Sequence, residues 1–156
     1  MRALLNSQYA WVQASREVLL QYCASLSEED FLSEHSVFGR GSIRNLLVHI
    51  ANTYEFWIGK QALNRPIDFT DYSSVKNVHQ AVILFTTVDK LMDEFLNSLE
   101  NDPCAEIAIT LNERTQSVST LKLFTHVLTH EFHHKGQILS LSRQLGYIPV
   151  DTDIVR

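Results

Sequence analysis

Cysteine is scarce in this chain. Only Cys23 and Cys104 occur among the 156 residues, far apart and in no C-x-x-C pair. Two such cysteines can build neither a disulfide framework nor a thiolate zinc cluster. This low usage is typical of a reducing compartment, so we expect a cytoplasmic protein. We expect neither cysteine to take part in a metal site or in its chemistry, since neither lies near a candidate metal ligand in the sequence.

Long apolar runs and an excess of positive charge are also missing. No run of about eighteen apolar residues exists, so we expect no membrane span. The opening residues, MRALLNSQYAWV, lack the basic start and long apolar core of a signal peptide. The net charge is −5 and the lysines and arginines are scattered, which argues against nucleic acid or an anionic membrane as a partner.

The length, the composition and the apolar spacing together predict one all-α domain over residues 1–156. The length suits a single core, and 45% hydrophobic with 20% charged residues is an ordinary globular balance. Apolar residues at helical spacing, with capping residues such as Ser42, predict four long helices. Alternation followed by a Thr/Ser/Val stretch predicts a short β-hairpin before the last helix. The expected architecture is a four-helix bundle. The predicted helices span 3–24, 43–63, 75–99 and 120–145, and the hairpin spans 106–119.

The segment THEFHHKGQ, residues 129–137, holds three of the seven histidines. Residues at i and i+4 lie on one face of a helix, so His130 and His134 can reach a common ion. At 100° per residue, both fall on or beside the apolar stripe of the last helix, whereas His126 and His133 lie further round. Two inward imidazoles need partners, because an unpaired buried polar group is costly. A metal would satisfy both, and the alternative is that they are ordinary core histidines bonded to backbone or side chains.

A third ligand has to come from another helix, and His49, in LLVHIAN, is the best candidate. It lies on the flank of its apolar stripe, from which a side chain can still face a neighbouring helix. The alternative is a packed histidine. We expect His35 and His79 at the surface or in loops. Three neutral imidazoles suit Zn²⁺, Ni²⁺ or another first-row ion and leave a coordination position open.

The same segment also spells H-E-x-x-H, the zinc helix of many metalloproteases. Such proteases need a third ligand downstream, yet no His or Glu follows His134. We therefore exclude the protease and expect Glu131 to be a helix-surface carboxylate rather than a partner of a ligand. Gln137 is placed to bond a ligand imidazole. Gly136 either permits close packing or is simply an unfavourable residue that the helix tolerates, since glycine costs about 1 kcal/mol relative to alanine inside a helix.

Two stretches carry a resemblance: SIRNLLVHIANTYEFW and HVLTHEFHHKGQILSLSRQLGY, which match a pattern H-x-x-x-H-[R/K]-G-Q. The chain resembles the DinB family, within the wider DinB/YfiT-like group, over nearly its whole length. Lys135 stands where Arg is commoner, which puts a bidentate anion contact there in doubt. The resemblance implies a four-helix bundle, often a homodimer, with zinc or nickel on three histidines. The implied ligands are His49, His130 and His134.

For function, the resemblance implies a metal-dependent enzyme acting on a small molecule. Some relatives transfer a low-molecular-weight thiol to an electrophile, while others have no established activity. Alternatives are a metal-dependent hydrolase and a non-catalytic or stress-response binding protein with a structural metal. A homodimer is also favoured by a second apolar face on the last helix, although packing under the hairpin or a loop would explain that face equally well. This face consists of Leu121, Leu128, Phe132 and Leu139.

Overall fold

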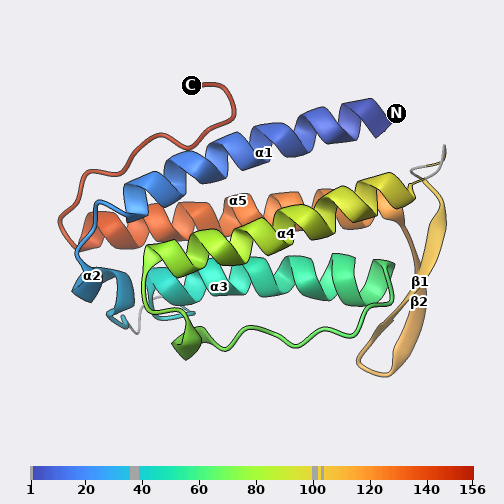
Figure 1. Ribbon diagram of the computed structural model, residues 1–156, viewed down its shortest axis with the longest axis horizontal. Helices are drawn as coiled ribbons and strands as arrows, with labels where there is room; N and C mark the ends of the chain where they lie inside the picture. Colours follow the sequence, from blue (N-terminus) through green and yellow to red (C-terminus); the bar gives the residue numbers. More distant parts are fainter. Residues whose placement is uncertain (1, 36–38, 100–101, 103) are drawn as a thin grey trace.

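The chain is mostly helical, with four long helices side by side and a small hairpin at one end (Figure 1). The computed structural model describes residues 2–35, 39–99, 102 and 104–156. The helices are α1 (Arg2–Cys23), α2 (Glu28–Leu32), α3 (Ile43–Tyr54), α4 (Val78–Ser98) and α5 (Thr120–Gln144). A π-helical segment (Glu55–Ala62) continues α3, and a 3₁₀ turn (Tyr72–Ser74) precedes α4. Strands β1 (Glu106–Leu111) and β2 (Arg114–Ser119) pair antiparallel.

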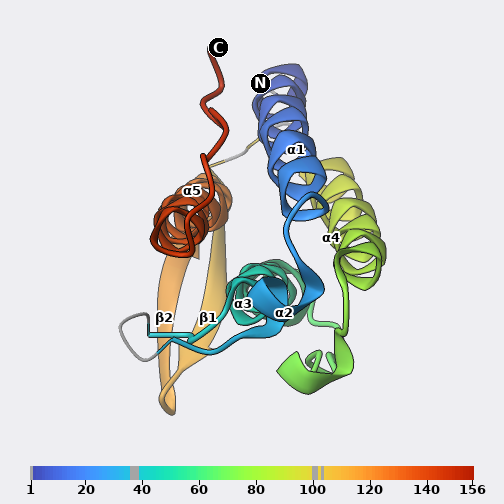
Figure 2. The ribbon, with the colours of Figure 1, turned by 90° about the vertical axis from the view of Figure 1, so that its left-hand side faces the viewer.

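The four long helices enclose the main hydrophobic core. Viewed from the end, α1, α4, α3 and α5 follow one another around it (Figure 2), and the neighbours in that order contact each other. Buried Leu, Ile, Val, Phe and Tyr side chains from all four fill the centre. The predictions of a mostly helical fold and of a hairpin before the last helix are confirmed. Within the described residues, no helix carries an apolar stretch long enough to cross a membrane.

Capping residues set where the helices begin. The Ser42 hydroxyl accepts from the Asn45 amide at 3.1 Å, so α3 begins where predicted. The Asn77 side chain accepts from the Gln80 amide at 3.0 Å, which starts α4 at Val78 rather than at residue 75. Each of these bonds satisfies an amide that the first helical turn would otherwise leave unpaired. Beyond α5, Gly146 has a φ of 93°, in the left-handed region that favours glycine after a helix end.

The predicted helix over 43–63 differs from the structure in its second half. The α-helical pattern ends at Tyr54, and the chain then widens into the π-helix, where the Leu63 amide donates to the Ile58 carbonyl five residues back. Gly59 lies under Ile67 in this wide turn, and an added Cβ would be 2.7 Å from Ile67 Cδ1, so the Ile67 side chain would have to shift to admit a larger residue. Apolar periodicity did not reveal the change. Within this π-helix, the Trp57 ring centroid lies 5.0 Å from the His126 ring centroid.

The hairpin is docked onto the π-helix. Asn112 and Glu113 both have positive φ, as a tight two-residue hairpin turn requires. The Gln61 side chain exchanges two hydrogen bonds of 2.9 Å with the backbone of Thr110 on β1. A second small apolar cluster seals this junction, so the hairpin fixes the end of α3 relative to the start of α5. The cluster consists of Ile109, Val118 and Leu123.

Candidate metal centre

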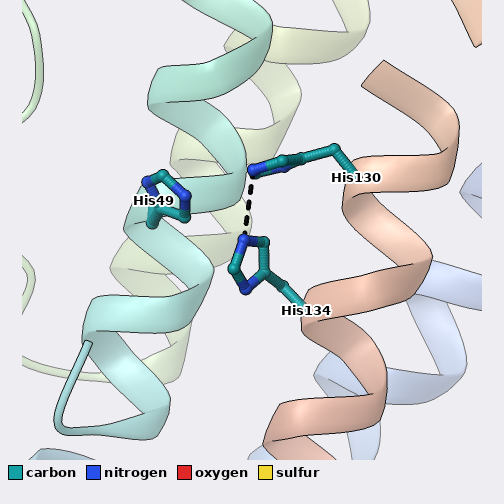
Figure 3. Close-up of side chains that lie close together, drawn as sticks. All are labelled: His49, His130 and His134. Carbon is teal, nitrogen blue, oxygen red and sulfur yellow. Dashed lines mark hydrogen bonds between the residues drawn. The ribbon is translucent and has the colours of Figure 1, made fainter. Parts of the chain in front are cut away.

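Three histidines from two helices converge between α3 and α5 (Figure 3). His49 comes from α3, and His130 and His134 come from successive turns of α5. One ring nitrogen from each lies within 4.8 Å of the other two. His134 is buried, and the other two are half-buried. The structure thus brings together the three residues that were predicted from separate sequence segments as candidate ligands.

The orientation of His134 is fixed by Gln137 one turn later. His134 Nδ1 lies 2.6 Å from Gln137 Oε1. An amide oxygen only accepts, so Nδ1 carries the proton and Nε2 keeps its lone pair. That Nε2 points to His130 Nε2 at 3.1 Å. The prediction that Gln137 bonds a ligand imidazole is confirmed for the contact itself.

The geometry and the donor set fit a divalent first-row metal. Metal–nitrogen bonds of about 2.0–2.1 Å place two tetrahedral ligand nitrogens about 3.3–3.4 Å apart. The 3.1 Å between the His130 and His134 nitrogens matches that spacing closely. Ligand distances up to 4.8 Å within the group require only a small shift of a side chain to close around an ion. Three imidazoles suit zinc, nickel and copper-like ions and leave one or more positions open.

The electrostatics keep these imidazoles neutral. Burial lowers the pKa of His49 to about 4, with Arg40 and His134 adding to the effect. Burial and the neighbouring histidines lower the pKa of His130 to about 3. Burial also lowers the pKa of His134, against the opposing effect of the hydrogen bond that His134 donates to Gln137. At neutral pH all three rings therefore present lone pairs, which is the form that a metal binds.

The other histidines lie outside this group. His126 and His133 are exposed, which agrees with their predicted position further round the helix from the apolar stripe. His133 Nε2 lies 3.3 Å from the Gln137 amide nitrogen, so it helps to orient Gln137 rather than the metal. His79 is exposed in the first turn of α4, and His35 lies in the loop after α2. Sequence spacing alone allowed His126 and His133 as ligands, and the helix orientation removes them.

The prediction that Glu131 is a helix-surface carboxylate is wrong. Its side chain is fully buried, 0% exposed, on the face of α5 that meets α1 and α3. Arg16 of α1 donates two hydrogen bonds to it, of 3.0 and 2.9 Å. Lys135 lies 3.0 Å from it, and the Tyr54 hydroxyl donates to it at 2.7 Å. A buried carboxylate needs such partners to offset its desolvation.

The buried cluster around Glu131 connects α5, the helix that carries His130 and His134, to the rest of the core. Arg16 also reaches Asp89 of α4 at 2.6 Å, and Lys135 donates to Ser15 of α1 at 2.9 Å. Two signals in the sequence pointed to it. Glu131 and Lys135 are spaced i, i+4, and Arg16 lies among apolar positions of the first helix. Because Glu131 and Lys135 each follow a candidate ligand in the sequence, the cluster fixes the backbone that carries His130 and His134.

Gly136 and the cysteines have no part in the site. Apart from its chain neighbours and the backbone of its own helix, a Cβ added to Gly136 would have no atom of the described residues within 4 Å, so the close-packing interpretation is not supported. Cys104 is exposed, and Cys23 is buried among apolar side chains. Burial raises the pKa of the Cys23 thiol to about 12, so it is protonated and unreactive at neutral pH.

We predict that Gln137→Leu weakens metal binding without unfolding the protein. Gln137 holds the His134 tautomer and ring orientation, and loss of such a partner typically costs about 10–100-fold in metal affinity. Calorimetric zinc titration measures the change. The matched control is Gln144→Leu, the same substitution at an exposed position of the same helix. Equal affinity of the Gln137→Leu variant and the unmodified chain would contradict the assigned role.

Comparison with known proteins places this geometry in a family. The chain is similar to "Uncharacterized protein YizA" from Bacillus subtilis (strain 168), with 24% identity over 155 residues, covering 95% of this chain and 91% of that protein. The model of the DinB family matches residues 1–156. Since that match includes both segments that carry the three histidines, as the resemblance predicted, the chain belongs to the DinB family.

Proposed function

We propose that this chain is a metal-dependent enzyme whose divalent ion, zinc or nickel, is held by His49, His130 and His134. We further propose that residues 1–156 form one domain, and that α1, α3, α4 and α5 are the helices of a four-helix bundle. The observation that carries the proposal is the convergence of three neutral imidazoles from two helices, one of them with its tautomer fixed by a neighbouring amide.

The proposed reaction is transfer of a low-molecular-weight thiol to an electrophile. A divalent ion in a site with an open position lowers the pKa of a coordinating thiol, so that it is held as thiolate. The thiol proton passes to solvent. The sulfur electron pair forms a new bond to the electrophilic carbon, and the leaving group departs with its bonding pair. No redox partner is required.

The chain itself would bind and orient the reactants. The three imidazoles fix where the sulfur lies, and the buried Glu131 cluster fixes the backbone of α5 beneath them. Trp57 is half-buried with its ring 5.0 Å from that of His126, which lies one turn of α5 before His130, and it offers apolar surface for the electrophile. Excluding water from this surface would favour thiol transfer over hydrolysis, the competing reaction of an open metal site.

A homodimer in the cytoplasm completes the proposal. The second apolar face of α5 is only half-buried against the core, which leaves apolar area for a partner chain. Oligomeric state is measured by light scattering. The face consists of Leu121, Leu128, Phe132 and Leu139.

The test of the reaction uses the full chain stripped of metal and reloaded with zinc or nickel. A panel of cellular thiols, glutathione among them, is mixed with 1-chloro-2,4-dinitrobenzene, whose chloride is the leaving group. We expect at least one thiol to react faster with loaded protein than with stripped protein. His79→Ala, which alters an exposed histidine of α4 outside the ligand set, serves as the control and should keep this rate.

Two other outcomes assign a different function. Bound metal without acceleration of any thiol favours the non-catalytic metal-binding protein. Metal-dependent cleavage of a nitrophenyl ester in the absence of thiol favours the hydrolase.

A further inference from the structure

Arg40 places an unpaired positive charge beside the three histidines. Its guanidinium Nη2 lies 3.5 Å from His49 Nε2. Within the described residues no carboxylate pairs with Arg40, because the acid of this region, Glu34, faces Arg44 at 3.8 Å instead. The Arg40 side chain is exposed and therefore free to turn toward a ligand. An arginine without an acidic partner next to a ligand set requires an explanation.

The backbone beneath Arg40 is held firmly in place. The Asn45 amide group donates to the Arg40 carbonyl at 2.8 Å, and the His35 amide donates to the Gly41 carbonyl at 2.6 Å. Gly41 has a φ of 82°, in the left-handed region that favours glycine. The loop is thus anchored to the first turn of α3, and the reach of the guanidinium toward the site is set by the fold.

Arg40 lies close to candidate ligands from both helices. Its Nη2 is 3.5 Å from His49 Nε2 on α3, and the His49 ring centroid lies 4.6 Å from that of His134 on α5. The guanidinium therefore lies at the edge of the space between α3 and α5 where a divalent ion would lie. Two cations at this separation repel each other, since the Coulomb energy of a close pair is substantial at a partly buried site. The arrangement becomes favourable when an anion lies between them.

We propose that Arg40 binds an anionic group of the molecule that takes the open coordination position, so that this site selects thiols carrying a carboxylate over neutral thiols. The inference rests on the proposed metal site. The planar guanidinium donates two parallel hydrogen bonds to a carboxylate, which adds direction to the charge attraction. Arg40 is then a specificity-determining residue: it does not hold the sulfur, but it holds the other end of the molecule.

The experiment measures binding rather than turnover. Cobalt(II) is loaded into the full chain, and the sulfur-to-cobalt absorption band is followed during titration with 3-mercaptopropionate or with its neutral isostere 3-mercaptopropionamide. We expect the carboxylate to bind about tenfold more tightly than the amide, the size of effect given by a charge-assisted hydrogen bond. In Arg40→Gln that preference should fall to about twofold or less, with unchanged affinity for the amide.

Arg44→Gln is the matched control, since this arginine lies four residues away and already has partners in Asn45 and Glu34. It should keep the full preference. An equal preference in the Arg40→Gln variant and the unmodified chain would overturn the inference, as would cobalt binding with no band from either thiol. Failure of the unmodified chain to bind cobalt would instead overturn the proposed function, and this inference with it.

Discussion

Glu131→Ala is expected to lower the free energy of unfolding of the metal-free protein by about 3–5 kcal/mol. The substitution leaves Arg16 and Lys135, which are only 3% and 1% exposed, without the carboxylate that lies between them. Removing one partner of a buried ion cluster is costly, because the remaining charges cannot recover their hydration. The loss is measured by chemical denaturation in the presence of a chelator, so that metal release does not contribute.

Glu17→Ala provides the control for this substitution. Glu17 is an exposed glutamate of α1 that accepts a hydrogen bond from Gln21, and its loss should change the free energy of unfolding by less than about 0.5 kcal/mol. A change below about 1 kcal/mol for Glu131→Ala would contradict the buried role. Replacing Arg16, Glu131 and Lys135 together by apolar residues of similar volume should restore part of the stability, because no buried charge then remains unpaired and only the buried Tyr54 hydroxyl loses its acceptor among these residues.

The same cluster predicts how acid affects stability. Burial alone would raise the pKa of Glu131, but Arg16 and Lys135 outweigh burial and lower this pKa to about 2. The unfolded chain protonates this residue near its ordinary pKa of 4.5. Its contribution is therefore complete above about pH 4.5 and is lost as the pH falls toward 2. Glu131→Gln should remove this part of the acid dependence.

The second large effect is expected at the metal ligands. His49→Ala and His134→Ala should each weaken zinc binding by on the order of a hundredfold to a thousandfold, because each removes one of three nitrogen donors. Metal analysis after dialysis and calorimetric titration measure the loss. His79→Ala, at an exposed histidine of α4, should retain the metal. Full metal retention in either ligand variant would refute the three-histidine site.

The affinity of the unmodified site should change little between pH 7 and pH 5.5. Metal binding competes with protonation of the ligands, and the pKa values of His49 and His130 are lowered to about 4 and about 3. Three imidazoles with an ordinary pKa near 6.5 would instead lose affinity by several hundredfold over this interval. Zinc titrations at the two pH values distinguish these cases, and a steep loss would show that the rings are not held neutral by burial.

Local patterns in the sequence predicted much of the fold. Apolar spacing and the cap at Ser42 located the long helices, and alternation located the hairpin at 106–119, because these signals act over a few residues. The end of α3 was not visible in this way. The change to π-helical hydrogen bonds after Tyr54 leaves no mark in apolar spacing over so few residues, so it became visible only in the tertiary structure.

The residues of the site also separate into those that local sequence spacing predicts and those that depend on tertiary contacts. The sequence by itself determined that His130 and His134 share one face of a helix, since i, i+4 spacing fixes this whatever the surroundings. Only the tertiary structure decided that His49 reaches them from α3, because that contact depends on how two helices face each other. The tertiary structure also moved Glu131 from the expected surface into the core. Its burial depends on Arg16, which is 115 residues away in the sequence and becomes a neighbour only when α1 packs against α5.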